Sequence, residues 1–211
     1  METGFSTRSV KTSEPATGRE GPNLYRLSVQ QYFQMMDAGI FKEGQRVELL
    51  GGLLIEKRTK YPPHNFGVGS FAEHLRNIVS PGWFVREEKA LDLDPLSRPE
   101  PDIVVARGPQ SLYSRRDPTV KDIALVIEVA DSSYSEDRNR KWNLYAAAKV
   151  PIYIILNIPA RRVELYRKPI GRGATARYRE TEVFEESSDL PVVIEGVELG
   201  QIAVRGVLSR L

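Results

Sequence analysis

The sequence predicts an α/β (α+β) domain with a mixed β-sheet core flanked by helices. Three short apolar runs predict central strands, because such runs between turn residues are typical of strands buried on both faces. They cover residues 102–106, 123–130 and 151–158. Helical patterns are interspersed with these runs, which favours helices packed on a sheet and permits a right-handed parallel crossover.

Length and composition limit the classes of protein to which the chain can belong. Its 211 residues fit one domain with a sizeable core. It contains no cysteine, which excludes disulfides and thiolate metal sites and fits a reducing cytoplasm. No apolar run approaches the roughly 20 residues of a membrane span. The net charge is only +2, so evidence for nucleic-acid binding has to be local.

The chain opens with a polar stretch rich in Gly, Ser, Thr and Pro. Residues 1–23 are therefore expected to be a disordered leader, and residues 24–211 a single domain. Ser28 is the expected cap of a helix over residues 29–38. The apolar face of this helix is interpreted as core packing and consists of Val29, Tyr32, Phe33 and Met36.

A hairpin is predicted over residues 46–57. Its turn is Gly51-Gly52, because a tight turn between two apolar strands needs positive φ angles. Glu48 lies inside the first strand, where a solvent-facing or salt-bridged residue and a site residue are both open interpretations.

A second helix is predicted over residues 64–79, with Pro63 in its first turn. His64 begins this helix beside apolar neighbours. A packed or capping histidine is the plainer interpretation there, and a site residue is the alternative. Residues 83–90 then predict a strand.

The second half of the chain adds one helix and several strands. The helix is expected over residues 135–149, with Ser135 as its cap and Trp142, Tyr145 and Ala146 on its apolar face. The alternating residues 163–167 predict a more exposed strand. The remaining predicted pieces are a tip at 171–173, a return strand at 176–184, and short strands or turns at 191–194 and 197–204.

Two acids interrupt or border the apolar strands, where an unpaired carboxylate is costly. Asp102 precedes I-V-V-A, and Glu128 lies within L-V-I-E-V-A, 128 − 102 = 26 residues later. If the strands pair, both carboxylates can approach one hard cation, Mg²⁺ or Mn²⁺, which prefers oxygen ligands. Lys141, in the following helix, is the ammonium placed to orient a water or stabilise a phosphate transition state. The alternative is that Lys141 is one basic residue on a solvated helix.

The order of these motifs resembles the Uma-two (Uma2) family of bacterial restriction-endonuclease-like proteins. The hairpin R-V-E-L-L-G-G-L-L-I-E resembles the opening strand pair of that family. The other residues that carry the resemblance are P-D at Pro101-Asp102, I-E-V-A-D-S-S at 127–133, the helix with Lys141 and Tyr145, and V-P-I-Y-I-I-L-N at 150–157. The resemblance covers about residues 27–167.

The resemblance implies a PD-(D/E)XK nuclease-like core, in which a lysine stands two positions after the second acid. That position is Ala130 in this chain, so the lysine is missing from its usual place. In the family, a lysine from the following helix is thought to substitute, which points to Lys141. The resemblance also implies that Glu48 completes the metal shell and that His64 supports the site or the substrate.

A basic segment follows over residues 161–179, with seven Arg or Lys residues against the single acid Glu164. Such a patch can hold a phosphate backbone without reading its sequence. The expected nucleic-acid contacts are Arg161, Arg162, Arg167 and Lys168. The equally weighted alternative is a charged hairpin that discourages edge-to-edge pairing.

Two functions therefore follow from the sequence. The first is an Mg²⁺-dependent endonuclease that hydrolyses DNA phosphodiester bonds through Asp102, Glu128 and Lys141. The second is a non-catalytic module that kept the fold and binds a nucleic acid or a protein. The buried acid Glu128 favours the first, and Ala130 favours the second. DNA is the expected partner, and the sequence leaves a monomer and a homodimer open.

Overall fold

The structure is a computed structural model that describes residues 24–210, so the predicted leader lies outside the described residues. A six-stranded mixed sheet, in the order β3-β4-β5-β6-β7-β8, forms its centre. Only β5 and β6 are parallel, and the other neighbours are antiparallel. The strands are β3 (Trp83–Glu87), β4 (Ile103–Arg107), β5 (Ile123–Ala130), β6 (Ile152–Asn157), β7 (Arg162–Ile170) and β8 (Arg177–Glu185).

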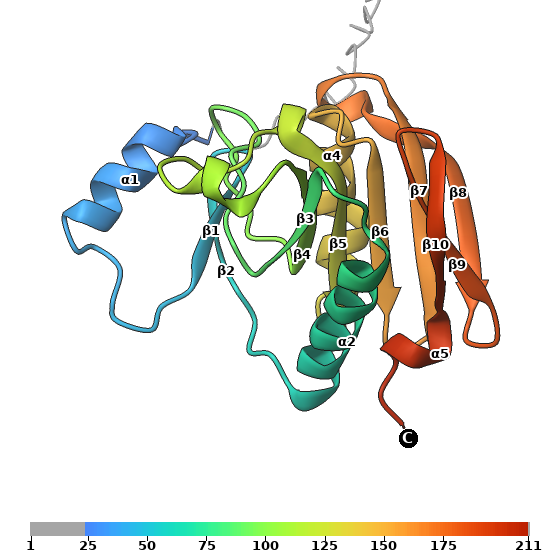
Figure 1. Cartoon of the computed structure of the whole chain (residues 1–211). Helices are drawn as coiled ribbons and strands as arrows, with labels where there is room; N and C mark the ends of the chain where they lie inside the picture. The colour runs from blue at the N-terminus through green and yellow to red at the C-terminus, as the bar shows by residue number, and fades with distance from the viewer. Residues whose placement is uncertain (1–23, 211) are drawn as a thin grey trace, which may run out of the picture.

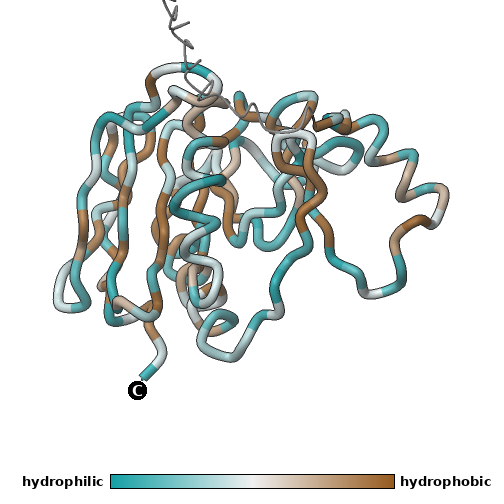
Figure 2. The backbone as a smooth tube through the Cα atoms, turned by 180° about the vertical axis from the view of Figure 1, so that it is seen from behind, coloured by the Kyte–Doolittle hydropathy of each residue, from teal (hydrophilic) through white to brown (hydrophobic). Residues whose placement is uncertain are grey.

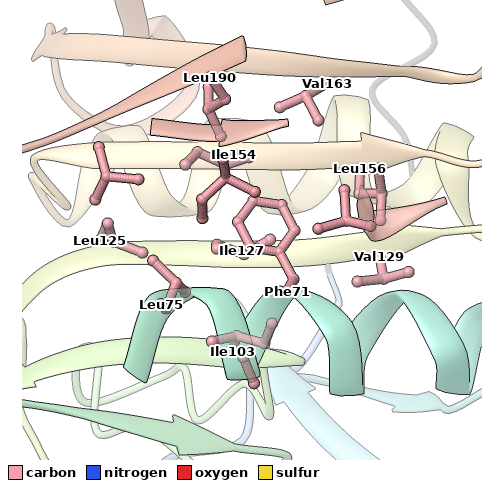
Figure 3. Packing of buried hydrophobic residues seen from close by; sticks show 14 of the residues in the cluster. Phe71, Leu75, Ile103, Leu125, Ile127, Val129, Ile154, Leu156, Val163 and Leu190 are labelled. Atoms are coloured by element: carbon pink, nitrogen blue, oxygen red, sulfur yellow. The ribbon is translucent and has the colours of Figure 1, made fainter. Parts of the chain in front are cut away.

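Two layers cover the faces of this sheet (Figure 1). On one face lie the helix α2 (Pro62–Ile78), the hairpin of β9 (Asp189–Ile194) and β10 (Val197–Ala203), and α5 (Val204–Val207). Figure 3 shows Phe71 and Leu75 of α2 packed against Ile127 of β5 and its neighbours. The other face is covered by α4 (Trp142–Ala147) and buries an aromatic cluster of Tyr145, Tyr153, Tyr166 and Tyr178.

The helical connection between the parallel strands differs from the single helix expected over residues 135–149. It consists of α3 (Tyr134–Glu136), a π-helical turn η3 (Asp137–Lys141) and α4. Ser135 lies inside α3 and not at its cap, and no side chain caps this helix start. A single π turn within a helix shifts the register of the residues that follow it and is frequent at functional sites.

The N-terminal elements lie beside the β3–β4 end of the sheet (Figure 1). They are α1 (Val29–Asp37), capped by Ser28 and Gln31, and the hairpin of β1 (Val47–Leu50) and β2 (Leu53–Glu56). Gly51 and Gly52 have φ angles of 58° and 77°, as the predicted turn requires. The expected core face of α1 is wrong in part, because only Tyr32 is buried while Phe33 and Met36 are 39% and 48% exposed.

The predicted fold class is confirmed, and so are the three central strands. The strand expected to be more exposed, over residues 163–167, is instead buried along most of its length as part of β7. The β9–β10 hairpin covers one face of β7 and the aromatic cluster covers the other. Figure 2 shows the resulting concentration of hydrophobic residues in the central strands.

The connecting segments contain short 3₁₀ turns. These are η1 (Gln110–Tyr113) and η2 (Val120–Asp122) in the expected loop before β5, and η4 (Gly173–Thr175) at the tip between β7 and β8. Within residues 24–210, no helix combines the length and apolarity that crossing a bilayer demands.

Candidate active site

A cavity of about 210 Å³ opens where β4 and β5 meet the β1–β2 hairpin and the start of α2. All five residues that the sequence predicted to be catalytic, metal-binding or supporting line it: Glu48, His64, Asp102, Glu128 and Lys141. They come from β1, α2, the residue before β4, β5 and the end of η3. Segments distant in sequence thus bring one charged cluster together.

Glu128 is the most deeply placed acid of this cluster, with 2% of its surface exposed. It lies on the same face of β5 as Val126 and Ala130, two residues away on either side, which pack on the α4 face of the sheet. The Tyr145 hydroxyl donates a hydrogen bond of 2.8 Å to Glu128 Oε1. Burial, helped by the nearby acids Asp137, Asp102 and Glu48, raises the pKa of the Glu128 carboxyl to about 8 against the opposing effect of Lys141.

Lys141 lies among three carboxylates. Its Nζ atom is 3.0 Å from Glu128 Oε1, 3.3 Å from Glu48 Oε1 and 3.6 Å from Asp137 Oδ1. The pKa of Lys141 lies well above its ordinary value, because these acids outweigh the effect of its burial. Three acids thus compete for one ammonium, so Lys141 stays charged while the buried acid Glu128 takes up a proton more readily.

Asp102 is held by donors on every side. The backbone amide of Val129 donates to its Oδ2 atom at 2.8 Å, and Nε2 of His64 donates to the same oxygen at 3.2 Å. Lys60 donates to Oδ1 at 2.7 Å. Burial opposes the charge of Asp102, but His64, Lys60 and Lys141 outweigh it and hold the pKa of this carboxyl well below its usual range.

Glu48 and the π turn complete the cluster. The backbone amide of Glu100 donates to Glu48 Oε2 at 3.0 Å, which fixes this carboxylate beside Lys141. Asp137 begins the π turn and Lys141 ends it. The Ser133 hydroxyl donates to Asp137 Oδ2 at 2.6 Å and so anchors the turn to the end of β5.

The donors of the cavity fit a hard cation by their chemistry, because carboxylate oxygens line it and no thiolate does. Within residues 24–210, however, no three His, Asp or Glu side chains are grouped in an arrangement that holds a metal ion. The ammonium of Lys141 lies between Glu48 and Glu128 instead.

Comparison with known proteins identifies the family of the chain. The family model Uma2, described as "Putative restriction endonuclease", matches residues 29–205. The chain belongs to the Uma2 family. Comparison with curated proteins finds no match.

A solved structure shares the Uma2 fold of this chain. It is described as the crystal structure of "a putative nuclease belonging to DUF820 from Anabaena variabilis ATCC 29413". The two match with a TM-score of 0.62 and 15% identity, over 86% of this chain and 97% of that chain. At this identity the likeness establishes the fold of the Uma2 domain and nothing more.

Two charged residues that the sequence did not single out for the site of this Uma2 domain contact its acids or its lysine: Lys60, which lines the cavity, and Asp137, which lies behind Lys141. Lys60 lies in the connection between β2 and α2, four residues before His64, and contacts Asp102. Asp137 lies four residues before Lys141, and that spacing on a helix is the signal that would have found it. No local pattern marks Lys60, because its partner Asp102 is distant in sequence.

The four cations predicted to contact nucleic acid each have a carboxylate partner within the chain. Arg161 pairs with Glu186, Arg162 with Glu164, Arg167 with Glu180 and Glu182, and Lys168 with Glu180. Residues 161–179 are basic in sequence because the partner acids, Glu164 excepted, come later in the chain, on β8 and just beyond it. The structure therefore favours the alternative of a charged hairpin.

A second buried acid, Glu164, lies in β7 outside the cavity. It accepts hydrogen bonds from the Tyr134 and Tyr166 hydroxyls, from Asn157 Nδ2 and from the Arg162 guanidinium. Burial acts to raise the pKa of the Glu164 carboxyl, but these donors outweigh it and lower the pKa.

Proposed function

We propose that this Uma2 protein is a metal-dependent endonuclease that hydrolyses phosphodiester bonds of DNA. The observation that carries the proposal is the meeting of Lys141 with Glu128 and Glu48 in the cavity that Asp102 also lines. Lys141 thus stands among the site acids although Ala130 occupies the position two after Glu128. Membership in the Uma2 family supports the same class of activity.

Each residue has a role that follows from its contacts. Asp102 and Glu128, with Glu48, would hold Mg²⁺ or Mn²⁺, and that cation would polarise the phosphate and lower the pKa of a bound water. Lys141, already within hydrogen-bonding reach of Glu128, orients the attacking water. His64 keeps Asp102 in its ionised form and its orientation.

A specific observation favours a second function, a non-catalytic module that binds a nucleic acid or a protein. The ammonium of Lys141 already neutralises the acids that a cation would need, and no three-residue metal cluster exists within residues 24–210. A protein of this kind would gain no stability from divalent cations.

The two functions separate in one experiment. The melting temperature is measured with EDTA and then with Mg²⁺ or Mn²⁺, since a cation that binds only the folded state raises it by mass action. Cleavage of supercoiled, linear and single-stranded DNA is measured in the same buffers. If the protein is a nuclease, the cation raises its melting temperature and at least one form of DNA is cut. If the melting temperature does not change and the DNA stays intact, the protein is the non-catalytic binding module.

A further inference from the structure

The wall of the cavity that comes from the β2–α2 connection is basic. It contributes Lys57, Arg58 and Lys60 to the lining. Its far end is fixed, because Tyr61 is extended, with φ −101° and ψ 164°, and precedes the prolines that begin α2. Its middle is tied across the cavity by a hydrogen bond from Arg58 Nη1 to the backbone carbonyl of Ser132.

Lys60 is the cation of this wall that reaches the site acids. Its ammonium donates to Asp102 Oδ1 at 2.7 Å and also contacts Glu88. An ammonium has three donor hydrogens, so Lys60 keeps one for a further acceptor. Its side chain is 13% exposed, which places it at the border between the buried acids and the open part of the cavity.

Lys141 is placed differently. Its side chain is 7% exposed, and three carboxylates surround its ammonium within 3.6 Å. The acids around its ammonium repel a phosphate anion, but they accept hydrogen bonds from a neutral water. Lys60 and Lys141 line the same cavity but thus differ in the charge of the ligand that each ammonium can contact.

We infer that Lys60 is the residue that contacts the scissile phosphate of the substrate, and that the nucleic-acid backbone enters over the basic wall of Lys57, Arg58 and Lys60. This inference rests on the proposed nuclease function. The ammonium of Lys60 donates its third hydrogen to a non-bridging phosphate oxygen and stabilises the charge that grows there as water attacks. No proton or covalent bond passes through Lys60.

Charge pairing distinguishes Arg58 of this path from the β7–β8 hairpin, whereas Lys57 pairs with Glu100 and Lys60 with Asp102 and Glu88. Each of the four hairpin cations named above is paired with a carboxylate. Arg58, in contrast, has no carboxylate partner among the described residues and contacts only a carbonyl there. A phosphate can therefore meet Arg58 without first displacing an acid.

The test separates phosphate contact from mere support of Asp102. Asp102→Asn gives a background that cannot hold its cation and in which Lys60 has lost its charged partner at Asp102. The affinity for a DNA duplex is measured as a function of salt concentration for two proteins, Asp102→Asn alone and Asp102→Asn with Lys60→Met. Loss of one phosphate contact reduces the slope of log K against log [salt] by about 0.9.

Matched variants complete the test. Lys121→Met removes an exposed lysine of η2 outside the cavity and leaves the slope unchanged. Lys60→Arg retains the slope, because its charge remains. Lys60→Gln replaces Lys60→Met if the latter does not fold. In the otherwise native protein, Lys60→Met reduces cleavage by about 10² while Mn²⁺ binding persists.

An unchanged salt slope in Lys60→Met would overturn the inference, and so would native cleavage by that variant. Failure of the nuclease proposal has a different signature, because the wild-type protein then cuts no DNA. If the wild type binds DNA without cutting it, the salt slopes still decide the role of Lys60. If it does not bind DNA at all, both proposals fall.

Discussion

Glu128 and Glu164 are two acids of the same sheet with opposite surroundings. Glu128 of β5 pairs in register with Ile155 of β6, and Ile155 pairs with Glu164 of β7. The two carboxylates therefore start from one row of the sheet, on one face, and each is 2% exposed. Burial alone does not distinguish them.

Their partners distinguish them. Glu164 accepts hydrogen bonds from four different side chains, and their combined effect lowers its pKa. Glu128 has Tyr145 and a lysine that it shares with two other acids, and its pKa is raised. Only Glu128 lines the cavity. A buried acid with every acceptor satisfied stabilises a fold, whereas a buried acid short of donors beside a cavity is prepared for a ligand.

The largest expected effect of this difference is on cation binding and cleavage. Glu128→Gln removes a proposed metal ligand and is expected to reduce Mn²⁺ affinity and DNA cleavage by about 10³ or more. Glu164→Gln makes the same chemical change on β7, two strands away in the sheet, and retains both cation binding and cleavage. Titration calorimetry with Mn²⁺ and a cleavage assay measure the pair. Equal losses in the two variants would contradict the distinction.

The next effect concerns stability without metal. Lys141→Met leaves Glu48, Glu128 and Asp137 without their shared ammonium, so the free energy of unfolding is expected to fall by roughly 3–5 kcal/mol in EDTA. A lysine on a solvated helix, the alternative interpretation of Lys141 from the sequence, would give little such loss, because exposed ion pairs contribute little to stability. Urea denaturation measures the change. A loss below about 1 kcal/mol would show that these acids do not depend on Lys141.

The charged residues of the cavity could be predicted from the sequence better than the partners of the surface charges. Glu128 could be found because it interrupts an apolar run, and Asp102 and Lys141 followed from the order of motifs. Glu164 could not be assigned, because its donor Tyr134 belongs to α3 and Asn157 to β6, and only the fold brings them to β7. The acids that neutralise the hairpin cations were also missed, since strand pairing and not sequence proximity brings them together.

A smaller expected effect is the pH dependence of stability, which differs between Glu128 and Glu164. The pKa of Glu164 lies below the 4.5 of an unperturbed glutamate, so its charged form stabilises the fold above that pH and the contribution disappears as the pH falls. Glu164→Gln is expected to lower stability at neutral pH by about 2 kcal/mol, or roughly 4–8 °C in melting temperature. This difference from wild type shrinks below pH 4.5.

Glu128→Gln is expected to show the opposite pH dependence in EDTA. The pKa of Glu128 is raised to about 8, so the wild type loses stability relative to the glutamine variant as the pH rises from 4.5 to about 8. Melting curves of both variants and wild type at several pH values measure this. Parallel pH profiles for Glu128→Gln and Glu164→Gln would contradict the difference in their surroundings.

The smallest expected effect is at the charged hairpin. Arg167→Gln with Lys168→Gln removes two exposed cations that already pair with Glu180 and Glu182. Exposed ion pairs contribute little to stability, so stability and DNA affinity change little, and the salt slope of binding is retained. A slope that falls by about 1.8, the value for two phosphate contacts, would restore the hairpin as the nucleic-acid surface.

A cleavage assay on three proteins in one buffer tests most directly whether the cavity acids, and not Glu164, support cation-dependent cleavage. Wild type, Asp102→Ala and Glu164→Gln are incubated with supercoiled DNA and Mg²⁺ or Mn²⁺, with EDTA as the control. Cleavage is expected from wild type and Glu164→Gln only when the cation is present, and none is expected from Asp102→Ala. Cleavage by Asp102→Ala at the wild-type rate, or intact DNA with every protein, would contradict this expectation.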